Sequence, residues 1–288
     1  MLYPPQGDSV REVVREVIRY FTIYPVYLQR VARVSGDDWD GAWGVAFSPD
    51  GKYLAVASGV ADAVEIMSVP SLERVSRVSG DDWDNVKKVA FSPDGNYLAV
   101  ACYFSYAVEI MTVPDLTRVS RVSGDDYTHA NDIAFSPDGN YLAVACYGIS
   151  TVEIMTVPDL QRVSRVSDAD WIYAAEVAFS PDGKYLAVTS PGGDLVDLLT
   201  VPDLQRVARV SGADWDGAWG VTFSPDGKYL AVASLMSDAV EVMTVPDLQR
   251  VARVSGADWD GTRNVAFSPD GKYLAVTSQY ADAFELMV

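Results

Sequence analysis

The residues that could perform chemistry are few. The chain has one histidine, His129, and two cysteines, Cys102 and Cys146. A single histidine excludes any site built from two or more, including the usual multi-histidine zinc sets. Asp126 and Asp132 lie near His129, but no serine or cysteine in a recognisable nucleophile motif accompanies them, and there is no glycine-rich phosphate loop. We therefore predict no catalytic residue, two buried cysteines, and a histidine in a loop.

Carboxylates next to aromatic residues are the other candidates. Hard carboxylate oxygens suit calcium, although Gly-Asp-Asp-Trp-Asp lacks the spacing of the twelve-residue calcium loop. The calcium candidates are Asp37, Asp38, Asp40, Asp81, Asp82 and Asp84. A recurring aromatic residue could stack on a sugar ring, as in a lectin, or could fill the gap between packed sheets. It occurs as Trp39, Trp83, Tyr127, Trp171, Trp215 and Trp259.

The overall charge restricts the class of partner. Lysine and arginine total 22 and aspartate and glutamate total 40, so the net charge is −18. This excess of acid argues against nucleic acid and against anionic membrane, both of which need a basic surface. The first 30 residues lack the features of a signal peptide, and no apolar run approaches the ~18 residues of a membrane span. We expect a soluble, monomeric, cytoplasmic protein; an extracellular location by another export route stays open.

An internal repeat dominates the chain. Ser-Pro-Asp-Gly recurs every 44 residues, at Ser48, Ser92, Ser136, Ser180, Ser224 and Ser268. Leu204–Gly217 and Leu248–Gly261 are identical, which indicates recent amplification or an engineered consensus. Six copies in one register predict six copies of one structural unit.

Each copy has the pattern of four short strands. In the second copy these are Val89–Ser92, Tyr97–Ala101, Ala107–Val113 and Arg118–Ser123, and Pro-Asp-Gly supplies the first turn. Turn signals every ~8–12 residues are typical of an all-β chain. Strand three of each copy carries an acid and strand four an arginine, so that Glu65 is expected opposite Arg77, and Glu285 opposite Arg33.

The motif order resembles the β-propellers of the WD-repeat and YVTN superfamily. The resemblance runs from about Leu28 to Val288 and is strongest in segments such as Val-Ala-Phe-Ser-Pro-Asp-Gly-Lys-Tyr-Leu-Ala-Val at 45–56. The chain departs from the WD pattern where the family's tryptophan is replaced by residues such as Met67 and Leu199. The resemblance implies a six-bladed β-propeller of four-stranded antiparallel blades. It also implies closure of the ring by pairing of the N-terminal outer strand, Leu28–Ser35, with the C-terminal blade.

Residues 1–27 lie outside the repeat, and 28–288 are assigned to the propeller. Ser9 and Glu12 form a possible capping box, and apolar residues from Val10 to Phe21 follow at helical spacing. We predict a short N-terminal helix, which either packs on the propeller or docks another chain.

Variation between the copies points to one face. In the propeller arrangement, the loops from strand four to strand one and from strand two to strand three share a face, and they hold twenty acids against three basic residues. The copies differ most in the two-to-three loops and at the entry to strand one, which the resemblance places around the mouth of a central channel. Variable loops on a rigid scaffold are a usual place for binding. The predicted partner-binding residues are Trp43, Lys87, Lys88, Asn131, Asp132, Glu176, Trp219, Arg263, Asn264, Tyr103, Phe104 and Tyr147.

Three functions follow in order of preference. The first is a non-enzymatic interaction propeller whose acidic, variable face captures a cationic protein or peptide without a cofactor. The alternative is a calcium- or glycan-binding module. An enzyme is the least favoured, since some six-bladed propellers are calcium-dependent hydrolases or lactonases but no residue pattern here supports such an activity.

Overall fold

The computed structural model of the chain describes residues 32–33, 42–256, 259–280 and 283–287. It divides into two compact units, Met1–Arg33 and Val34–Val288. Only two residues of the first unit are described, and both lack regular secondary structure. The predicted N-terminal helix lies outside the described residues, and the predicted boundary between residues 27 and 28 stays a prediction.

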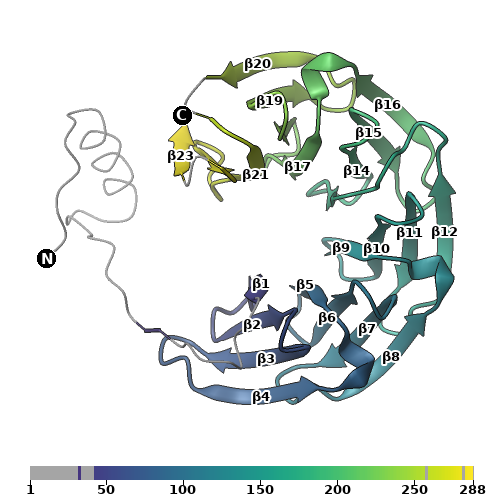
Figure 1. Ribbon diagram of the computed structural model, residues 1–288, viewed down its shortest axis with the longest axis vertical. Coiled ribbons are helices and arrows are strands. Elements are labelled where there is room, and N and C mark those ends of the chain that lie inside the picture. Colours follow the sequence, from purple (N-terminus) through teal and green to yellow (C-terminus); the bar gives the residue numbers. More distant parts are fainter. Residues whose placement is uncertain (1–31, 34–41, 257–258, 281–282, 288) are drawn as a thin grey trace, which may run out of the picture. The chain divides into compact units, whose positions relative to one another are not determined.

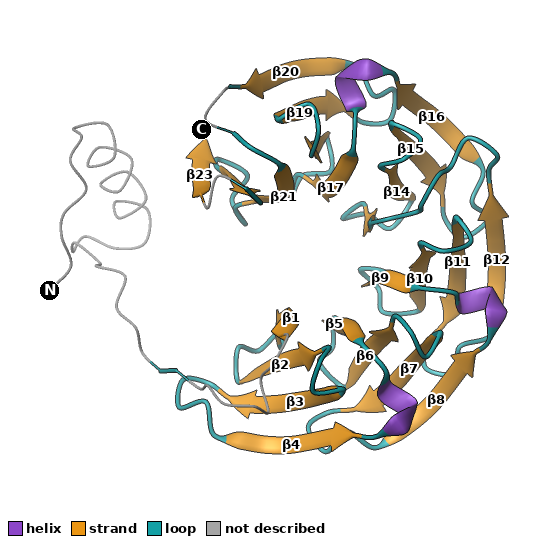
Figure 2. Cartoon of the chain, in the orientation of Figure 1, coloured by secondary structure: helices purple, strands orange, loops and turns teal. Residues whose placement is uncertain are grey.

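The second unit consists of six antiparallel sheets (Figures 1 and 2). The first sheet is β1 (Ala42–Phe47), β2 (Tyr53–Ser58), β3 (Ala63–Ser68) and β4 (Arg74–Ser79). The second is β5 (Val86–Phe91), β6 (Tyr97–Cys102), β7 (Ala107–Thr112) and β8 (Arg118–Ser123). The third is β9 (Ala130–Phe135), β10 (Tyr141–Cys146), β11 (Thr151–Thr156) and β12 (Arg162–Ser167).

The remaining three sheets repeat this order. The fourth is β13 (Val177–Phe179), β14 (Tyr185–Ser190), β15 (Leu195–Thr200) and β16 (Arg206–Ser211). The fifth is β17 (Ala218–Phe223), β18 (Tyr229–Ser234), β19 (Ala239–Thr244) and β20 (Arg250–Ser255). The sixth is β21 (Thr262–Phe267), β22 (Leu274–Ser278) and β23 (Ala283–Met287). Three single 3-10 turns precede first strands, at η2 (Asp81–Trp83), η3 (Asp125–Tyr127) and η4 (Ala213–Trp215).

The turn between strands one and two is fixed by side chains as well as by glycine. In the second sheet, the Ser92 hydroxyl donates to Asp94 Oδ1 at 2.6 Å and accepts from the Tyr97 amide at 2.9 Å. Gly95 has a φ of 75°, a left-handed conformation that costs glycine little. The Ser-Pro-Asp-Gly motif therefore specifies a tight turn that starts strand two in a fixed register.

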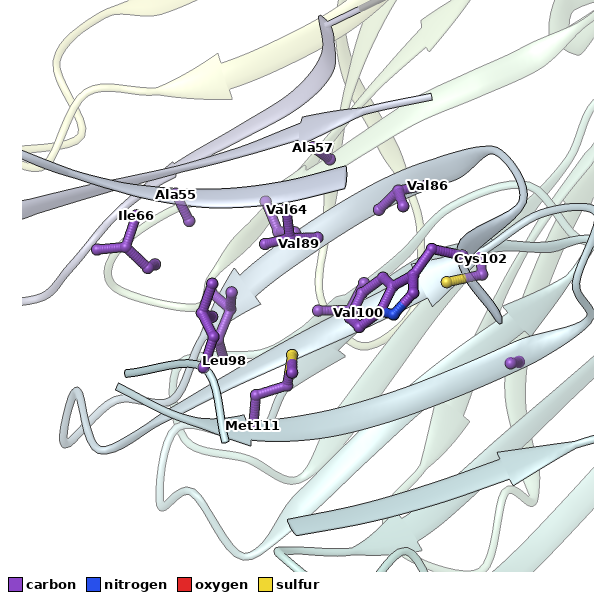
Figure 3. Close-up of a cluster of buried hydrophobic side chains, with 13 residues drawn as sticks. Ala55, Ala57, Val64, Ile66, Val86, Val89, Leu98, Val100, Cys102 and Met111 are labelled. Carbon is purple, nitrogen blue, oxygen red and sulfur yellow. The ribbon is translucent and has the colours of Figure 1, made fainter. Parts of the chain in front are cut away.

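Consecutive sheets pack face to face. The small side chains Ala55 and Ala57 of the first sheet lie against Leu98, Val100 and the neighbouring apolar residues of the second sheet (Figure 3). The same arrangement recurs at each of the five junctions between consecutive sheets. Alanine on one face and larger residues on the other let the sheets approach closely and fill the space between them.

The predicted charge pairs between strands three and four are present in five sheets. Glu65 lies opposite Arg77 in the register of β3 and β4. Its buried carboxylate accepts from Arg77 at 2.6 Å and from Arg74 at 2.7 Å. The corresponding pairs are Glu109 with Arg121, Glu153 with Arg165, Asp197 with Arg209, and Glu241 with Arg253. The sixth predicted pair, Glu285 with Arg33, joins residues of different units and is not tested by these registers.

The predicted fold of six four-stranded blades is wrong in its strand count. The sixth sheet has three strands, and within the described residues β23 pairs only with β22. The segment Leu28–Ser35, expected to complete it, lies outside the described residues except for Ala32 and Arg33, which form no strand. The described residues contain no α-helix either, only the three short 3-10 turns.

Candidate functional site

The two sets of variable loops share one face, as the sequence predicts. The Tyr103 amide donates to the Asn85 carbonyl at 2.9 Å, and the Tyr147 amide donates to the His129 carbonyl at 3.0 Å. Each bond joins the loop after strand two to the loop before strand one of the same sheet. These bonds hold both loops at one end of the sheet, so their side chains surround a common surface.

A β-bulge turns one side chain of the first strand toward this surface. In the first sheet Ala42 pairs with Ser58 and Gly44 with Ala57, which leaves Trp43 as the extra residue. The extra residues at this position in four other sheets are Lys87, Asn131, Trp219 and Arg263. A bulge interrupts the alternation of side chains along a strand and re-aims one of them. Neighbouring positions such as Lys87 and Lys88 can therefore border the same space.

The first strands of five sheets, β1, β5, β9, β17 and β21, contribute with Glu176, the residue before β13, to one cavity of about 450 Å³, which we call the mouth site. Figure 1 shows these strands on the inner side of the succession of sheets. The lining residues are Trp43, Lys87, Lys88, Asn131, Asp132, Glu176, Trp219, Arg263, Asn264 and Gln279. Nine of these ten are among the predicted partner-binding residues; only Gln279 is not.

Of the two carboxyl groups in the mouth site, that of Asp132 is already ion-paired, and the ionised form of Glu176 is disfavoured by burial. Asp132 is buried, pairs with Lys88 at 2.8 Å and accepts from the Val177 amide at 3.0 Å. This pairing raises the pKa of Lys88. Burial, followed by repulsion from Asp132, raises the pKa of Glu176 to about 7. A carboxyl group that titrates near neutral pH in a cavity is a common feature of functional sites.

Two cations of the mouth site rest on tryptophan faces. Lys87 Nζ lies 3.7 Å from the ring centre of Trp43, and the Arg263 guanidinium lies 4.1 Å from that of Trp219. Burial and the nearby charge of Arg263 lower the pKa of Lys87 to about 8, and burial lowers the pKa of Arg263. Both cations are partly desolvated by their surroundings, which strengthens any interaction with an anion.

The other predicted residues form aromatic clusters beside the cavity. Tyr103 stacks on His129 with ring centres 4.4 Å apart, and Phe104 meets both rings edge-on. Tyr147 stacks on Tyr173 at 4.3 Å, and its ring centre lies 6.1 Å from that of Trp219. These aromatic rings extend the mouth site outward along the loops. No sequence signal predicts that His129 and Tyr173 pair with these rings, because the partners belong to different repeats.

Large apolar side chains are exposed on the same loops. Trp43 at the mouth is 53% exposed. The exposed apolar residues in the loops around it are Val60, Phe104, Ile172, Tyr173, Met236 and Tyr280. Aromatic residues and methionine are enriched at protein interfaces, where their large surfaces become buried. The face therefore combines a polar cavity with an apolar rim.

Many loop aspartates are neutralised by arginines of the next sheet. Asp126 pairs with Arg162 at 2.9 Å and with Arg165 at 2.6 Å, and these contacts lower its pKa to about 2. Asp214 pairs with Arg250 and Arg253 in the same way. The face is thus less acidic than the sequence predicts. Among the described residues, the exposed loop aspartates that lie outside these ion pairs are Asp84, Asp125, Asp216 and Asp260.

The calcium candidates do not gather into a ligand set within the described residues. Asp82 contacts Arg118 and Arg121, and Asp84 is exposed. Asp37, Asp38 and Asp40 lie outside the described residues, and nothing is described of the Asp81 side chain. No group of three or more His, Cys, Asp or Glu side chains in the described part of the chain could hold a metal ion.

The recurring loop aromatics fill the gaps between sheets. Trp83, Tyr127, Trp171, Trp215 and Trp259 are all buried, and Trp171 Nε1 donates to Asp197 at 2.6 Å. Buried rings cannot stack on a sugar, so the lectin-like interpretation is wrong for these five residues. Trp39 lies outside the described residues.

The predicted absence of an activated thiol agrees with the burial of both cysteines. Cys102 and Cys146 are fully buried, and this burial raises the pKa of each to about 12. A thiol with such a pKa stays protonated and is a poor nucleophile. His129 is a loop residue with a φ of 57°, as expected.

A succession of radial antiparallel sheets around one cavity defines a β-propeller, and the chain is a β-propeller. A model described as "WD domain, G-beta repeat" matches residues 29–62 and 73–105. A second model, "Lactonase, 7-bladed beta-propeller", matches residues 132–255 and contradicts the predicted total of six blades. No curated protein matches the chain.

One solved structure shows the likeness of fold. Hydrazine synthase from Kuenenia stuttgartiensis is similar over 87% of this chain and 77% of its own, with a TM-score of 0.68 and 21% sequence identity. None of the helices among the described residues has the length and apolar character of a membrane span.

Proposed function

We propose that the chain is a non-enzymatic interaction propeller that binds a protein or peptide on the face carrying the mouth site. The observation that carries this proposal is the place where the repeats differ. The sheet interiors are nearly the same in every copy, whereas the residues lining the cavity vary between copies, and only Trp43 and Trp219 are alike at one repeat position. A single site built from different residues of each sheet suits one particular ligand, whereas identical residues on every sheet would suit several copies of the same ligand.

The exposed apolar rim favours a macromolecular partner. Phe104, Met236 and Tyr280 lie on three different two-to-three loops, and each leaves a large apolar surface in water. A small ligand in the cavity would cover few of these side chains. A protein or peptide lying across the face would cover several of them, and their burial would stabilise the complex by roughly 25 cal/mol per Å².

The partner is proposed to be cationic in the part that lies over the rim. The exposed aspartates Asp84, Asp216 and Asp260 recur at one repeat position, and the chain carries a net charge of −18. A field of one sign speeds the encounter with an opposite charge and weakens with added salt.

A pull-down from the source cells tests this function. The wild-type chain is compared with Phe104→Asp/Met236→Asp on the rim and with Val163→Asp on an outer strand, where an exposed valine provides a matched control. We expect proteins retained by the wild type and by the control to be lost with the rim variant, and retention to fall at high salt. Equal retention by all three chains would exclude the rim, and retention that ignores salt would exclude a cationic partner.

A hydrolase is a second candidate, because of Glu176. Its carboxyl group lines the cavity, titrates near neutral pH, and lies in the segment that the lactonase model matches. In this proposal Glu176 accepts a proton from water as the water oxygen attacks a lactone carbonyl, and the proton passes to the departing ring oxygen. Turnover of lactones that disappears in Glu176→Gln would support it; no turnover by the wild type across a lactone panel would reject it.

A further inference from the structure

We propose that the mouth site binds a carboxylate group, held between Lys87 and Arg263. This inference rests on the proposed function and deepens it, and the test below distinguishes a carboxylate of the bound partner from that of a separate small molecule. The cationic groups of the partner are expected to bind at the rim of the face, whereas the carboxylate binds in the cavity at its centre.

The cavity offers more to an anion than to a cation. Asp132 is satisfied by Lys88 and by a backbone amide, so it has little left for a further cation. Burial raises the pKa of Glu176 to about 7, so a substantial part of its carboxyl groups is uncharged at neutral pH. Lys87 and Arg263, in contrast, have no carboxylate within ion-pair distance among the described residues. The unneutralised charge in the cavity is therefore positive, although the chain as a whole is strongly acidic.

The two cations are held in place for this role. Each lies against a tryptophan face, and Arg263 Nη1 also donates to Gln279 Oε1 at 2.9 Å. These contacts leave other N–H groups of the guanidinium and the three protons of the ammonium for a ligand. Their mutual repulsion, which contributes to the lowered pKa of Lys87, would be relieved by an anion between them.

The remaining lining residues favour a carboxylate over a phosphate. Asn131 and Asn264 supply amide groups, and protonated Glu176 can donate a hydrogen bond to a carboxylate oxygen. A phosphate dianion concentrates two charges on one group, whereas each carboxylate group carries one, so the charge of buried Asp132 would repel phosphate more strongly. The planar guanidinium of Arg263 matches the two oxygens of a carboxylate.

Calorimetry with glutarate and with inorganic phosphate at pH 7.5, where phosphate is mainly the dianion and Lys87 is still mainly charged, tests the assignment. We expect glutarate to bind more tightly than phosphate, and Lys87→Met and Arg263→Met each to weaken glutarate binding at least tenfold. Both substitutions keep an apolar stem on the tryptophan, and circular dichroism and melting temperature check that each variant folds. Lys184→Met removes an exposed lysine that pairs only with Asp182 in a strand-one-to-two turn, and should leave binding unchanged.

A second arm identifies the source of the carboxylate. A short peptide with a free C-terminal carboxylate is compared with the same peptide amidated at its C-terminus. Tighter binding of the free acid assigns the site to a peptide carboxylate, whereas binding of glutarate alone assigns it to a small ligand. The inference is overturned if neither probe binds, if phosphate binds more tightly than glutarate, or if both cavity variants bind like the wild type. Loss of partner capture in the rim variant would still support the proposed function, so the two failures are distinguishable.

The pH dependence adds an independent readout. The charged and titratable groups that line the cavity are Lys87, Lys88, Asp132, Glu176 and Arg263. Between pH 6 and 9 Glu176 gains a negative charge and Lys87 loses a positive one, while Lys88 and Arg263 stay charged. Both changes weaken an anion complex, so glutarate affinity should fall at least tenfold over this range. An affinity that is constant or rises would contradict the assignment.

Discussion

Among the residues of the mouth site, Glu176 shows most directly how burial changes chemistry. Its carboxyl group is partly enclosed, its nearest charged neighbours include Asp132, and the cation that could offset its charge, Lys88, is paired with Asp132. Desolvation therefore outweighs attraction, and the neutral form is favoured. Lys87 is affected in the opposite sense, because burial next to Arg263 favours the uncharged amine.

The raised pKa of Glu176 makes the free energy of unfolding depend on pH. The pKa of Glu176 is about 7 in the folded chain and 4.5 in the reference state. An acid with a raised folded pKa stabilises the fold below its unfolded pKa, and this contribution is lost as the pH rises through the folded value. Glu176→Gln should therefore match the wild type in stability at pH 5 and exceed it by about 1–3 kcal/mol at pH 8.5.

Thermal melting of both chains at the two pH values measures the effect. The exposed Glu73 provides the control, since Glu73→Gln should change the melting temperature little at either pH. A Glu176→Gln chain that is less stable than the wild type at pH 8.5 would show that the carboxylate is stabilised rather than penalised in its cavity.

At the scale of the elements, the bulged first strand depends on close contact between neighbouring sheets. Gly44 and Gly220 occupy the position that holds Lys88 in the second sheet. A Cβ built on Gly220 would lie 2.5 Å from the Arg263 carbonyl oxygen and 3.0 Å from the Asn264 Cα. Backbone atoms of β21 cannot move away cheaply, so only glycine lets β17 and β21 approach at this point.

Gly220→Ala should therefore displace the first strand and disturb the mouth site. We expect a loss of about 1–3 kcal/mol in the free energy of unfolding, as for other overpacked positions, and weaker binding at Arg263. Gly256→Ala is the matched control, because a Cβ there would have no atom within 4 Å. Similar melting temperatures for the two variants would mean that the sheets are not in close contact at Gly220.

The ion-pair networks of strands three and four offer a comparison between buried and exposed acids with the same partners. Glu109 is fully buried and pairs with Arg118 at 2.8 Å and with Arg121. Asp82 contacts the same two arginines at 3.4 and 3.7 Å but is 64% exposed. Removing a buried partner leaves the other charges uncompensated, whereas an exposed pair is screened by water.

Glu109→Ala should accordingly cost about 3 kcal/mol in the free energy of unfolding, and Asp82→Ala less than about 1 kcal/mol. Chemical denaturation of the two variants and the wild type measures the difference. Equal losses would mean that burial does not govern the strength of these networks. The comparison needs no further control, because both substitutions remove a carboxylate from one pair of arginines.

For the whole molecule, the repeat made most of the architecture predictable. The 44-residue period revealed the repeating unit, and the acids opposite Arg77 and its counterparts indicated the register of strands three and four that is present in five sheets. Comparison of the copies with one another also identified nine residues that line a single cavity. The 44-residue period and the differences between copies are visible in the amino-acid sequence alone.

Features that depend on contacts between repeats could not be read in this way. The pairing of Asp82 with Arg118 crosses from one sheet to the next, and it reduces the free charge that the composition predicts. The bulge at Lys87 is a change of backbone register without a residue signature. The completion of the sixth sheet by Leu28–Ser35 was expected from the family pattern, and this segment lies outside the described residues apart from Ala32 and Arg33.

The first strand of the first sheet is exposed to solvent at a position where the first strand of the second sheet is buried. Val45 in β1 is 67% exposed, whereas the equivalent Val89 in β5 is 2% exposed because the first sheet covers it. Replacing valine by threonine keeps the shape and adds a hydroxyl, which costs roughly 1–3 kcal/mol when it is buried without a partner. Val89→Thr should therefore lower the melting temperature by several degrees, and Val45→Thr should leave it almost unchanged. If both variants lose the same stability, the outer face of the first sheet is covered in solution by something beyond the described residues, and the mouth site is enclosed on that side as well.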